Sequence, residues 1–329
     1  MIKKIKYRFN LVIHQVLFSL GFGNNLLKNR YGECVMVYHG IDQNGSKKYN
    51  TRFVSKNYFD KQIKFFSENY NVVGLDDYYK GNFKEGTLNI CITFDDGYLN
   101  NYKYAIPVLK KYNIPATFFI TTIKNESNFL WTDFVDLITT KSSKEITFDD
   151  YKFEKNNNGE YYNESIKLSL KQYCITLDYD KIIPLFSIFK NEWKEILQDD
   201  SLNDYWQLMS SKEIKEIAEN PLFTIGSHSK YHTSFTHINE KNIKYELNES
   251  KNYLEKICGY EIDSFAFPYG HYNKEVINIC EKEGFKKILL LDYNNSYDTA
   301  NENLKNRFGI NPFVSFKQQI VFLLKGSYI

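Results

Sequence analysis

The stretch NICITFDDGY, residues 89–98, places an apolar, β-prone run directly before two adjacent aspartates and a glycine. Similar runs recur along the chain, at CVMVY (34–38), NVVGL (71–75), ATFFI (116–120), LFTIG (222–226), SFAF (264–267) and KILLL (287–291). Helix-like stretches lie between them, at 57–69, 100–113, 240–258 and 273–284. Strands that alternate with helices indicate parallel β/α units. We therefore predict an α/β fold, a distorted (β/α)7-type barrel whose active site lies at the carboxyl ends of its strands.

The alternation of strands and helices is interrupted between about residues 122 and 221. This part of the chain contains a polar NNNG turn at 156–159 and then helical periodicity through 164–219. Since the strand pattern resumes after it, we interpret it as a largely helical insertion within one barrel domain of residues 31–329. We expect substrate specificity to reside in this insertion.

Composition excludes several classes of protein. The 329 residues include 42 Lys+Arg and 40 Asp+Glu, a net charge of +2, with 43% apolar residues. A chain with this apolar content and so small a net charge is too hydrophobic to be disordered. Only four of the cations are arginine, so specific nucleic-acid binding, which relies on Arg, is not expected. Five cysteines without a Cys-x-x-Cys spacing indicate a reducing compartment, not a disulfide framework.

Residues 1–30 are predicted to form an amphipathic N-terminal helix. Cations at positions 3, 4, 6 and 8 lie among apolar residues at helical spacing, and no small-x-small cleavage site follows. The apolar run is too short to span a bilayer. Two interpretations remain open: a helix on an anionic membrane surface, in contact through residues 1–20, and a helix packed on the domain itself. The missing cleavage site and the pattern of the cysteines favour a cytoplasmic protein. Under the first interpretation, this protein lies at the inner face of the membrane.

Three polar clusters follow apolar runs. Asp95 and Asp96 follow the run at 89–94, and His228 and His232, four residues apart, follow the run at 222–226. The third cluster is the loop FPYG (267–270), which leaves the Tyr269 N–H free to point inward. Taken singly, these are an ordinary turn, an incidental histidine pair and a common loop. Together they supply two imidazoles, one metal-binding carboxylate and one spare carboxylate, a set typical of a hydrolytic metal site.

In this order, TFDDGY, SHSKYH and FPYG resemble the polysaccharide deacetylases, the NodB-homology domains of carbohydrate esterase family 4. The resemblance extends to VMVYHGI (35–41), IPVLKKYNIPATFFIT (106–121) and FAFPYGHYN (265–273). It covers most of the chain outside the N-terminal helix, the insertion and the last few dozen residues. It implies a hydrolase that removes N-acetyl groups from an amino-sugar glycan or glycoconjugate in surface-polysaccharide metabolism. A divalent metal is implied as cofactor: zinc, with cobalt, nickel and manganese as alternatives.

The resemblance also implies a role for each motif residue. Asp95 would be the general base that takes a proton from water. The metal ligands would be Asp96, His228 and His232. The metal and the backbone N–H of Tyr269, in a loop fixed by Pro268, would hold the tetrahedral oxyanion.

The sequence departs from the familiar family pattern at two positions. The late strand reads ILLLD and lacks the usual histidine, whereas His39 ends the early strand MVYH. This order resembles the branch in which the catalytic-histidine strand comes first, as in exopolysaccharide poly-N-acetylglucosamine deacetylases, so we expect His39 to be the general acid. Ala266 stands where the family usually has an arginine that orients the base. Arg307, beyond the last predicted strand, is the candidate by elimination.

Further residues are weaker candidates for contact with substrate. His271 lies on the FPYG loop, and Tyr98, Trp131 and Tyr272 are candidates for stacking on a sugar, although core packing is the default interpretation in a chain so rich in aromatics. His237 is expected to be structural or exposed. Two rival functions remain: a carbohydrate-binding relative without turnover, suggested by Ala266 and the missing late histidine, and an O-deacetylase that uses the same residues.

Overall fold

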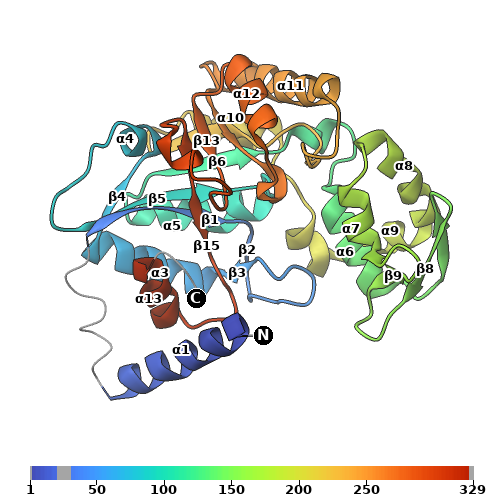
Figure 1. Cartoon of the computed structure of the whole chain (residues 1–329), viewed down its shortest axis with the longest axis horizontal. Helices are drawn as coiled ribbons and strands as arrows, with labels where there is room; N and C mark the ends of the chain where they lie inside the picture. Colours follow the sequence, from blue (N-terminus) through green and yellow to red (C-terminus); the bar gives the residue numbers. More distant parts are fainter. Residues whose placement is uncertain (1, 21–30, 326–329) are drawn as a thin grey trace.

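The structure is a computed structural model that describes residues 2–20 and 31–325. At its centre lies one large sheet in which every recorded strand pair is parallel (Figure 1). Its strands are β1 (Gly32–Tyr38), β4 (Asn71–Val73), β5 (Leu88–Phe94), β6 (Ala116–Ile120), β11 (Phe223–Ser227), β12 (Ser264–Ala266), β13 (Lys287–Leu289), β14 (Leu304–Lys305) and β15 (Arg307–Gly309). All seven runs predicted as strands form strands of this sheet.

The sheet closes into a barrel through a segment that the sequence pattern did not predict. β14 pairs with β13 and β15 pairs with β1, and only Asn306 separates the two strands. The segment 304–309 therefore joins the two ends of the series β1-β5-β6-β11-β12-β13 and is the seventh barrel strand. β4, one of the seven predicted strands, pairs only with the first half of β5. The α/β barrel is confirmed, but its closing strand differs because 304–309 carries polar residues that hide its β pattern.

Amphipathic helices cover the outside of the barrel. They are α3 (Lys56–Asn69), α4 (Leu75–Tyr79), the π-helical turn η1 (Asn101–Ala105), α5 (Ile106–Lys111), α11 (Glu240–Cys258), α12 (Lys274–Lys282) and α13 (Phe316–Lys325). Polar caps begin several of them: the side chains of Ser55, Asn239 and Asn273 each accept a hydrogen bond from a first-turn N–H. Except in α4, the buried faces of these helices and the outer face of the sheet form one large apolar core. The buried side chains of α4 belong to a second, smaller cluster, together with Phe119.

Between β6 and β11, which pair with each other, the chain forms a separate lobe at the right of Figure 1. Its elements are η2 (Thr122–Asn125), α6 (Trp131–Lys141), β7 (Ile146–Phe148), β8 (Tyr151–Lys155), β9 (Tyr161–Asn163), β10 (Leu168–Ser169), α7 (Leu170–Ile175), α8 (Tyr179–Ile188), α9 (Lys190–Leu197) and η3 (Asp200–Tyr205). The last helix before β11, α10 (Ser211–Ala218), packs on the barrel beside α11 and not in the lobe (Figure 1), and its Ile214 and Ile217 belong to the large barrel core. The lobe is largely helical, and an aromatic cluster forms most of its core. The small antiparallel sheet β7–β10 was not predicted, because strands of two to five residues are too short to show a clear alternation.

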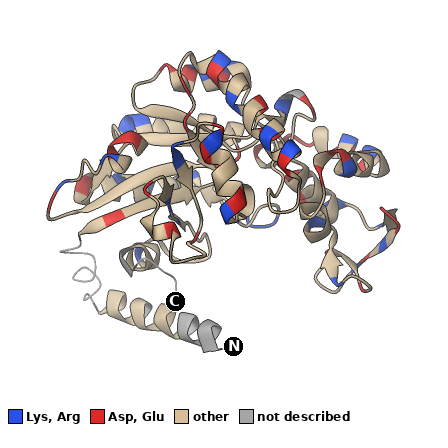
Figure 2. Cartoon of the chain, turned by 45° about the horizontal axis from the view of Figure 1, so that its top comes forward, with Lys and Arg blue, Asp and Glu red and all other residues tan. Residues whose placement is uncertain are grey.

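The N-terminal helix α1 (Ile2–Ser19) lies beside α13 (Figure 1). Gln318 Nε2 donates to the Leu11 carbonyl over 2.9 Å, and the His14 and Phe322 rings lie 5.3 Å apart. Charged residues of both signs are spread over the rest of the fold, whereas residues 9–19 of the helix carry none (Figure 2). Across residues 2–20 and 31–325, no helix combines the length and the apolar character needed to cross a membrane.

Candidate active site

The polar clusters that follow the predicted strands meet at one end of the barrel. His39 follows β1, Asp95 and Asp96 follow β5, and His228 follows β11. The loop after β12, which contains Tyr269, lies at the same end. Parallel strands bring their carboxyl ends together, so side chains distant in sequence share one site.

Asp96, His228 and His232 form a compact buried triad. Asp96 Oδ1 lies 3.3 Å from His228 Nε2 and 3.1 Å from His232 Nε2. The three side chains are at most 2% exposed. One ligand atom from each residue lies within 4.8 Å of the others. Two imidazole nitrogens and a carboxylate oxygen in this arrangement suit a divalent metal with further coordination positions open.

The second ring nitrogen of each histidine is held by the protein. His228 Nδ1 lies 2.8 Å from the Ala266 carbonyl oxygen, and His232 Nδ1 lies 3.1 Å from the Tyr269 hydroxyl. These contacts orient both rings so that Nε2 faces Asp96. The two carboxylate oxygens of Asp96 are buried and have no hydrogen-bond partner among the described residues. A buried carboxylate left without hydrogen bonds is costly, so the donor set fits a bound metal ion.

The backbone at this site adopts unusual conformations. Asp96, His232 and Tyr269 have φ values of 77°, 57° and 60°, in the left-handed region that residues with a Cβ rarely occupy. Such conformations cost about 1–3 kcal/mol each and persist only where the surroundings enforce them. Three of them in one site indicate that the fold positions these side chains at the expense of backbone strain.

Asp95 forms a buried bidentate ion pair with Arg307. Arg307 Nη1 and Nη2 donate to Asp95 Oδ1 and Oδ2 over 2.7 and 2.8 Å, and Nε donates to the Leu290 carbonyl over 3.3 Å. Burial by itself raises the pKa of Asp95, but the charges of Arg307 and His228 outweigh it and lower the pKa below its usual value. Asp95 is therefore ionised at neutral pH and fixed in orientation.

Arg307 enters the site from the strand that closes the barrel. Its guanidinium lies 5.8 Å from the centre of the Phe119 ring inside the barrel. Ala266, which is fully buried and packs in the same cluster as Phe119 and Leu289, contributes only a methyl group there. Arg307, which lies beyond the last predicted strand, is the first residue of β15. The structure thus places an arginine against Asp95, although the position that usually carries one is alanine.

His39 is half-buried and lies close to the other charged groups of the site. Burial and the charge of Arg52 lower the pKa of His39 to about 3, although Asp96 and Asp95 oppose that shift. Its ring is therefore neutral at neutral pH before substrate binds. The negative charge of a tetrahedral intermediate would favour its protonation.

Arg52 is a charged group of the site that sequence reasoning missed. Its Nη2 lies 3.7 Å from Asp96 Oδ2, and its side chain is 34% exposed. It lies in the loop between β2 (Ile41–Asp42) and β3 (Val54–Ser55). The next residue, Phe53, anchors this loop, because its ring packs 4.9 Å from that of Tyr98 and lies directly over Gly40. An arginine in a polar loop gives no sequence signal, since only the fold brings it to Asp96.

Three aromatic candidates for sugar stacking turn out to be buried. Tyr98 is fully buried, and its hydroxyl donates to Asp133 Oδ1 over 2.9 Å, so the prediction that it stacks on a sugar is wrong. Trp131 is also fully buried. Tyr272 is 6% exposed and donates to Asp298 Oδ2 over 2.6 Å. The high aromatic content of the chain serves core packing at these positions.

The loop after β12 keeps its predicted place. Pro268 is buried, and in the described part of the chain no hydrogen-bond partner is recorded for the backbone N–H of Tyr269. His271 is exposed, and its Nδ1 lies 2.9 Å from Ser234 Oγ. His237 is exposed, as expected. The side chain of Tyr269, which the sequence gave no reason to consider, contacts His232.

Known proteins share this sequence pattern. A family model described as polysaccharide deacetylase matches residues 84–288. The chain is similar to the poly-β-1,6-N-acetyl-D-glucosamine N-deacetylase of Staphylococcus aureus (strain MSSA476), with 34% identity over 152 residues, which are 44% of this chain and 47% of that protein. The matched part thus spans about half the length of such curated relatives.

Solved structures share the fold. A Streptococcus pyogenes deacetylase, PplD, in complex with acetate superposes with a TM-score of 0.55 at 17% identity, over 88% of this chain and 96% of that one. A polysaccharide deacetylase from Bacillus cereus gives a TM-score of 0.56 at 19% identity, over 88% of this chain and 69% of that one. IcaB from Ammonifex degensii gives 0.52 at 18% identity, over 90% and 97% of the two chains.

Proposed function

The chain belongs to the polysaccharide deacetylase family, and from this premise we propose that it is a metal-dependent hydrolase that removes N-acetyl groups from an amino-sugar glycan or glycoconjugate. The observation that carries the proposal is the buried triad of Asp96, His228 and His232 with the Asp95–Arg307 pair beside it. The N-deacetylase activity named for the Staphylococcus aureus relative supports the choice of an acetamide as the bond that is broken.

We assign the first half of the reaction to Asp95. Asp96, His228 and His232 would hold a divalent ion, zinc or alternatively cobalt, nickel or manganese. When bound, this ion supplies Lewis acidity toward the acetamide carbonyl and the attacking water. Asp95 takes a proton from that water, and Arg307 keeps its carboxylate ionised and aimed during the transfer. The Tyr269 N–H, for which no partner is recorded among the described residues, would donate to the developing oxyanion.

We assign the second half of the reaction to His39. Cleavage of the carbon–nitrogen bond releases the sugar amine, which leaves readily only if its nitrogen gains a proton. His39 lies at the end of β1, within the field of Asp95 and Asp96, and is the candidate that delivers it. Two features of the sequence, Ala266 and the missing late histidine, favoured a relative without turnover. However, Arg307 pairs with Asp95 and His39 lies at the site, so an arginine and a histidine are both present.

The proposed reaction predicts metal-dependent release of acetate. Chelator-treated protein should release no acetate from oligomers of N-acetylglucosamine, and addition of zinc or cobalt should restore release. Quantification of free acetate and of new primary amines, in a one-to-one ratio, checks the prediction. Acetate without new amines would instead support an O-deacetylase. Failure to release acetate with any of the four metals, together with retained glycan binding, would support the non-catalytic alternative.

We further propose that α1 contacts an anionic membrane surface. The face of α1 away from α13 is apolar and open to solvent: Phe9, Val12 and Val16 are 65%, 59% and 49% exposed, and Leu20, directly after the helix, is 63% exposed. The first 32 residues contain six Lys or Arg and no acidic residue. An exposed apolar stripe on a helix with a cationic sequence matches the chemistry of anionic lipid headgroups over acyl chains. The packing of the other face on α13 is compatible with this contact.

Co-sedimentation with vesicles tests the membrane proposal. The chain should bind vesicles rich in phosphatidylglycerol and not those of phosphatidylcholine. The double variant Val12→Glu, Val16→Glu should weaken binding at least about tenfold, because each apolar side chain contributes about 1.5–3 kcal/mol when buried. The matched control replaces Ile183 and Leu197, which are 45% and 43% exposed in the insertion, and should bind normally. Equal binding by both double variants would contradict the proposal.

A further inference from the structure

The turn that follows β5 and carries the two aspartates is held from both of its ends. On its N-terminal side, the Asp95 N–H donates to the Tyr38 carbonyl of β1 over 3.0 Å. Asp96 then adopts the left-handed conformation, with a φ of 77°. Such a conformation persists only where the surroundings enforce it, and no hydrogen bond from the described residues reaches the Asp96 side chain. The contacts of the flanking residues therefore hold this conformation.

On the C-terminal side of the turn, the contacts come from the last part of the insertion. The backbone of residues 207–209 exchanges two hydrogen bonds with Gly97 and Leu99, over 2.9 and 2.8 Å. Together they form a short antiparallel bridge centred on Tyr98 and Leu208. The barrel thus holds the turn before Asp96, and the insertion holds it after Asp96.

The side chain of Tyr98 adds a contact with α6 of the insertion. It is fully buried, and its hydroxyl donates to Asp133 Oδ1 over 2.9 Å. Asp133 Oδ2 is buried and has no hydrogen-bond partner in the described part of the chain. A buried carboxylate with an unpaired oxygen costs stability, which an apolar residue at this position would avoid. The hydrogen bond that Asp133 accepts, and not its packing, therefore accounts for a carboxylate here.

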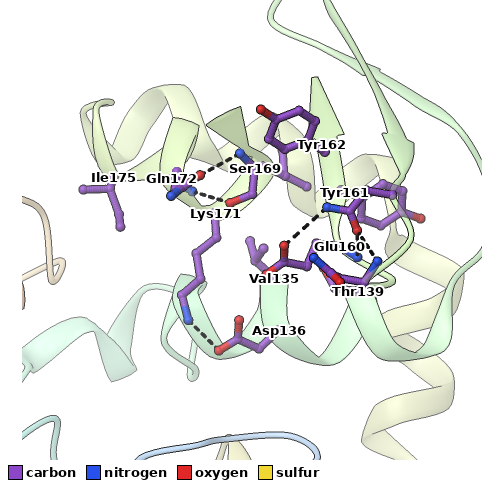
Figure 3. A pocket seen from close by; sticks show the side chains of 13 residues that line it. Val135, Asp136, Thr139, Glu160, Tyr161, Tyr162, Ser169, Lys171, Gln172 and Ile175 are labelled. Carbon is purple, nitrogen blue, oxygen red and sulfur yellow. Dashed lines mark hydrogen bonds and ion pairs between the residues drawn. The ribbon is translucent and has the colours of Figure 1, made fainter. Parts of the chain in front are cut away.

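The helix that carries Asp133 is itself anchored in the lobe. Figure 3 shows Lys171 reaching from α7 to Asp136 on α6 at the edge of a cavity, where Nζ and Oδ2 lie 2.5 Å apart. On the buried side of α6, Phe134 and Leu137 are at most 1% exposed and pack in the aromatic core of the lobe. The lobe therefore presents Asp133 to the turn from a fixed helix.

We propose that Tyr98 and Asp133 are positioning residues, through which the insertion holds Asp96 in its strained conformation and sets the affinity of the site for its divalent ion. The inference rests on the proposed function, because it takes Asp96 as a metal ligand. Both side chains act through the backbone of the turn. Replacing a residue that supports a metal ligand typically weakens metal binding about 10–100-fold. The insertion thus has a role beyond substrate specificity, since it completes the metal site.

Metal titrations of the chelator-treated full chain test the inference. Tyr98→Phe keeps the ring and removes only the hydroxyl, so it should weaken zinc and cobalt binding at least about tenfold. Asp133→Leu removes the acceptor and should weaken binding likewise. Asp133→Asn keeps an acceptor for the hydroxyl and should bind metal as wild type does. The visible absorption of bound cobalt, which reports ligand geometry, should change in Tyr98→Phe and Asp133→Leu and not in Asp133→Asn.

Tyr161→Phe is the matched control. Tyr161 lies in the same lobe (Figure 3), is also buried, and its hydroxyl donates to the Lys144 carbonyl over 2.8 Å. The control loses a comparable buried hydrogen bond and a comparable amount of thermal stability, but should keep the metal affinity and the cobalt spectrum of wild type. Wild-type metal affinity in Tyr98→Phe, or equal weakening in Tyr161→Phe, would overturn the inference.

Two further measurements keep the outcomes separate. Thermal unfolding reports whether each variant is folded, and if Tyr98→Phe is not, the comparison of Asp133→Asn with Asp133→Leu decides: equal metal affinities of these two would overturn the inference. Acetate release by the wild-type chain is measured in parallel. A wild-type chain that binds metal without releasing acetate would contradict the proposed reaction, while weaker metal binding in Tyr98→Phe alone would still support the positioning role.

Discussion

The variant Asp95→Asn is expected to lower kcat/KM for acetate release by about 10²–10⁴-fold, the range that a positioned general base contributes. Asparagine has nearly the same shape as aspartate and can still accept one hydrogen bond from Arg307, but it cannot take a proton from water. The metal triad is formed by other side chains, so the variant should bind metal with the same stoichiometry. Steady-state kinetics together with metal analysis of the same sample check both expectations.

The matched control for Asp95→Asn is His39→Ala on two substrates. Loss of a general acid should slow cleavage of the acetamide by a similar factor, because the sugar amine is a poor leaving group until its nitrogen is protonated. It should slow an activated aryl acetate far less, since that leaving group departs without a proton, whereas Asp95→Asn should slow both. A rate on the acetamide within a few-fold of wild type would show that His39 is not the acid. Equal losses of His39→Ala on both substrates would indicate a structural defect.

The residues that could be located from sequence alone are those that directly follow a strand. Asp95, Asp96 and His228 each end a run of β-prone residues, and parallel topology alone brings such positions together. The backbone strain that fixes Asp96 and His232 carried no such signal, because aspartate and histidine are ordinary residues in turns. The identities and positions of these ligands could therefore be predicted from the sequence, but their strained backbone conformations could not.

The residues that sequence reasoning missed act over long separations. Arg52 contacts Asp96 across 44 positions of sequence, from a loop held by the packing of Phe53 on Tyr98. Arg307 was found only by elimination, because β14 and β15 are two and three residues long and carry a polar pattern. Tyr98, a candidate for contact with a sugar, is covered by the insertion, which supplies Asp133 as the acceptor for its hydroxyl. Tertiary packing decides each of these cases, and local periodicity does not report it.

The second large effect is expected on stability, from the pair of Asp95 and Arg307. Arg307→Met leaves a buried carboxylate without its partner, which should lower the free energy of unfolding by about 3–5 kcal/mol at neutral pH. The double variant Asp95→Asn, Arg307→Met removes both charges and should recover most of that loss while remaining inactive. Lys287→Met, which breaks partly exposed pairs with Asp263 and Asp76, is the control and should cost about 1 kcal/mol or less for each pair. Denaturant unfolding of wild type, both single variants and the double variant completes the cycle, and Lys287→Met is measured beside them as the control.

The difference in free energy of unfolding between wild type and Arg307→Met should depend on pH, because the pKa of Asp95 is lowered in the folded protein. A carboxyl whose folded pKa lies below its unfolded value of about 4 adds stability above that value and loses it as pH falls through the folded pKa. In Arg307→Met, burial acts without the guanidinium and raises the folded pKa, so ionisation of Asp95 costs stability as pH rises. The gap between wild type and Arg307→Met should therefore be widest at neutral pH and should narrow on acidification. A gap that stays constant from pH 7 to pH 4 would mean that Arg307 stabilises the barrel through its packing on Phe119 and not through the charge of Asp95.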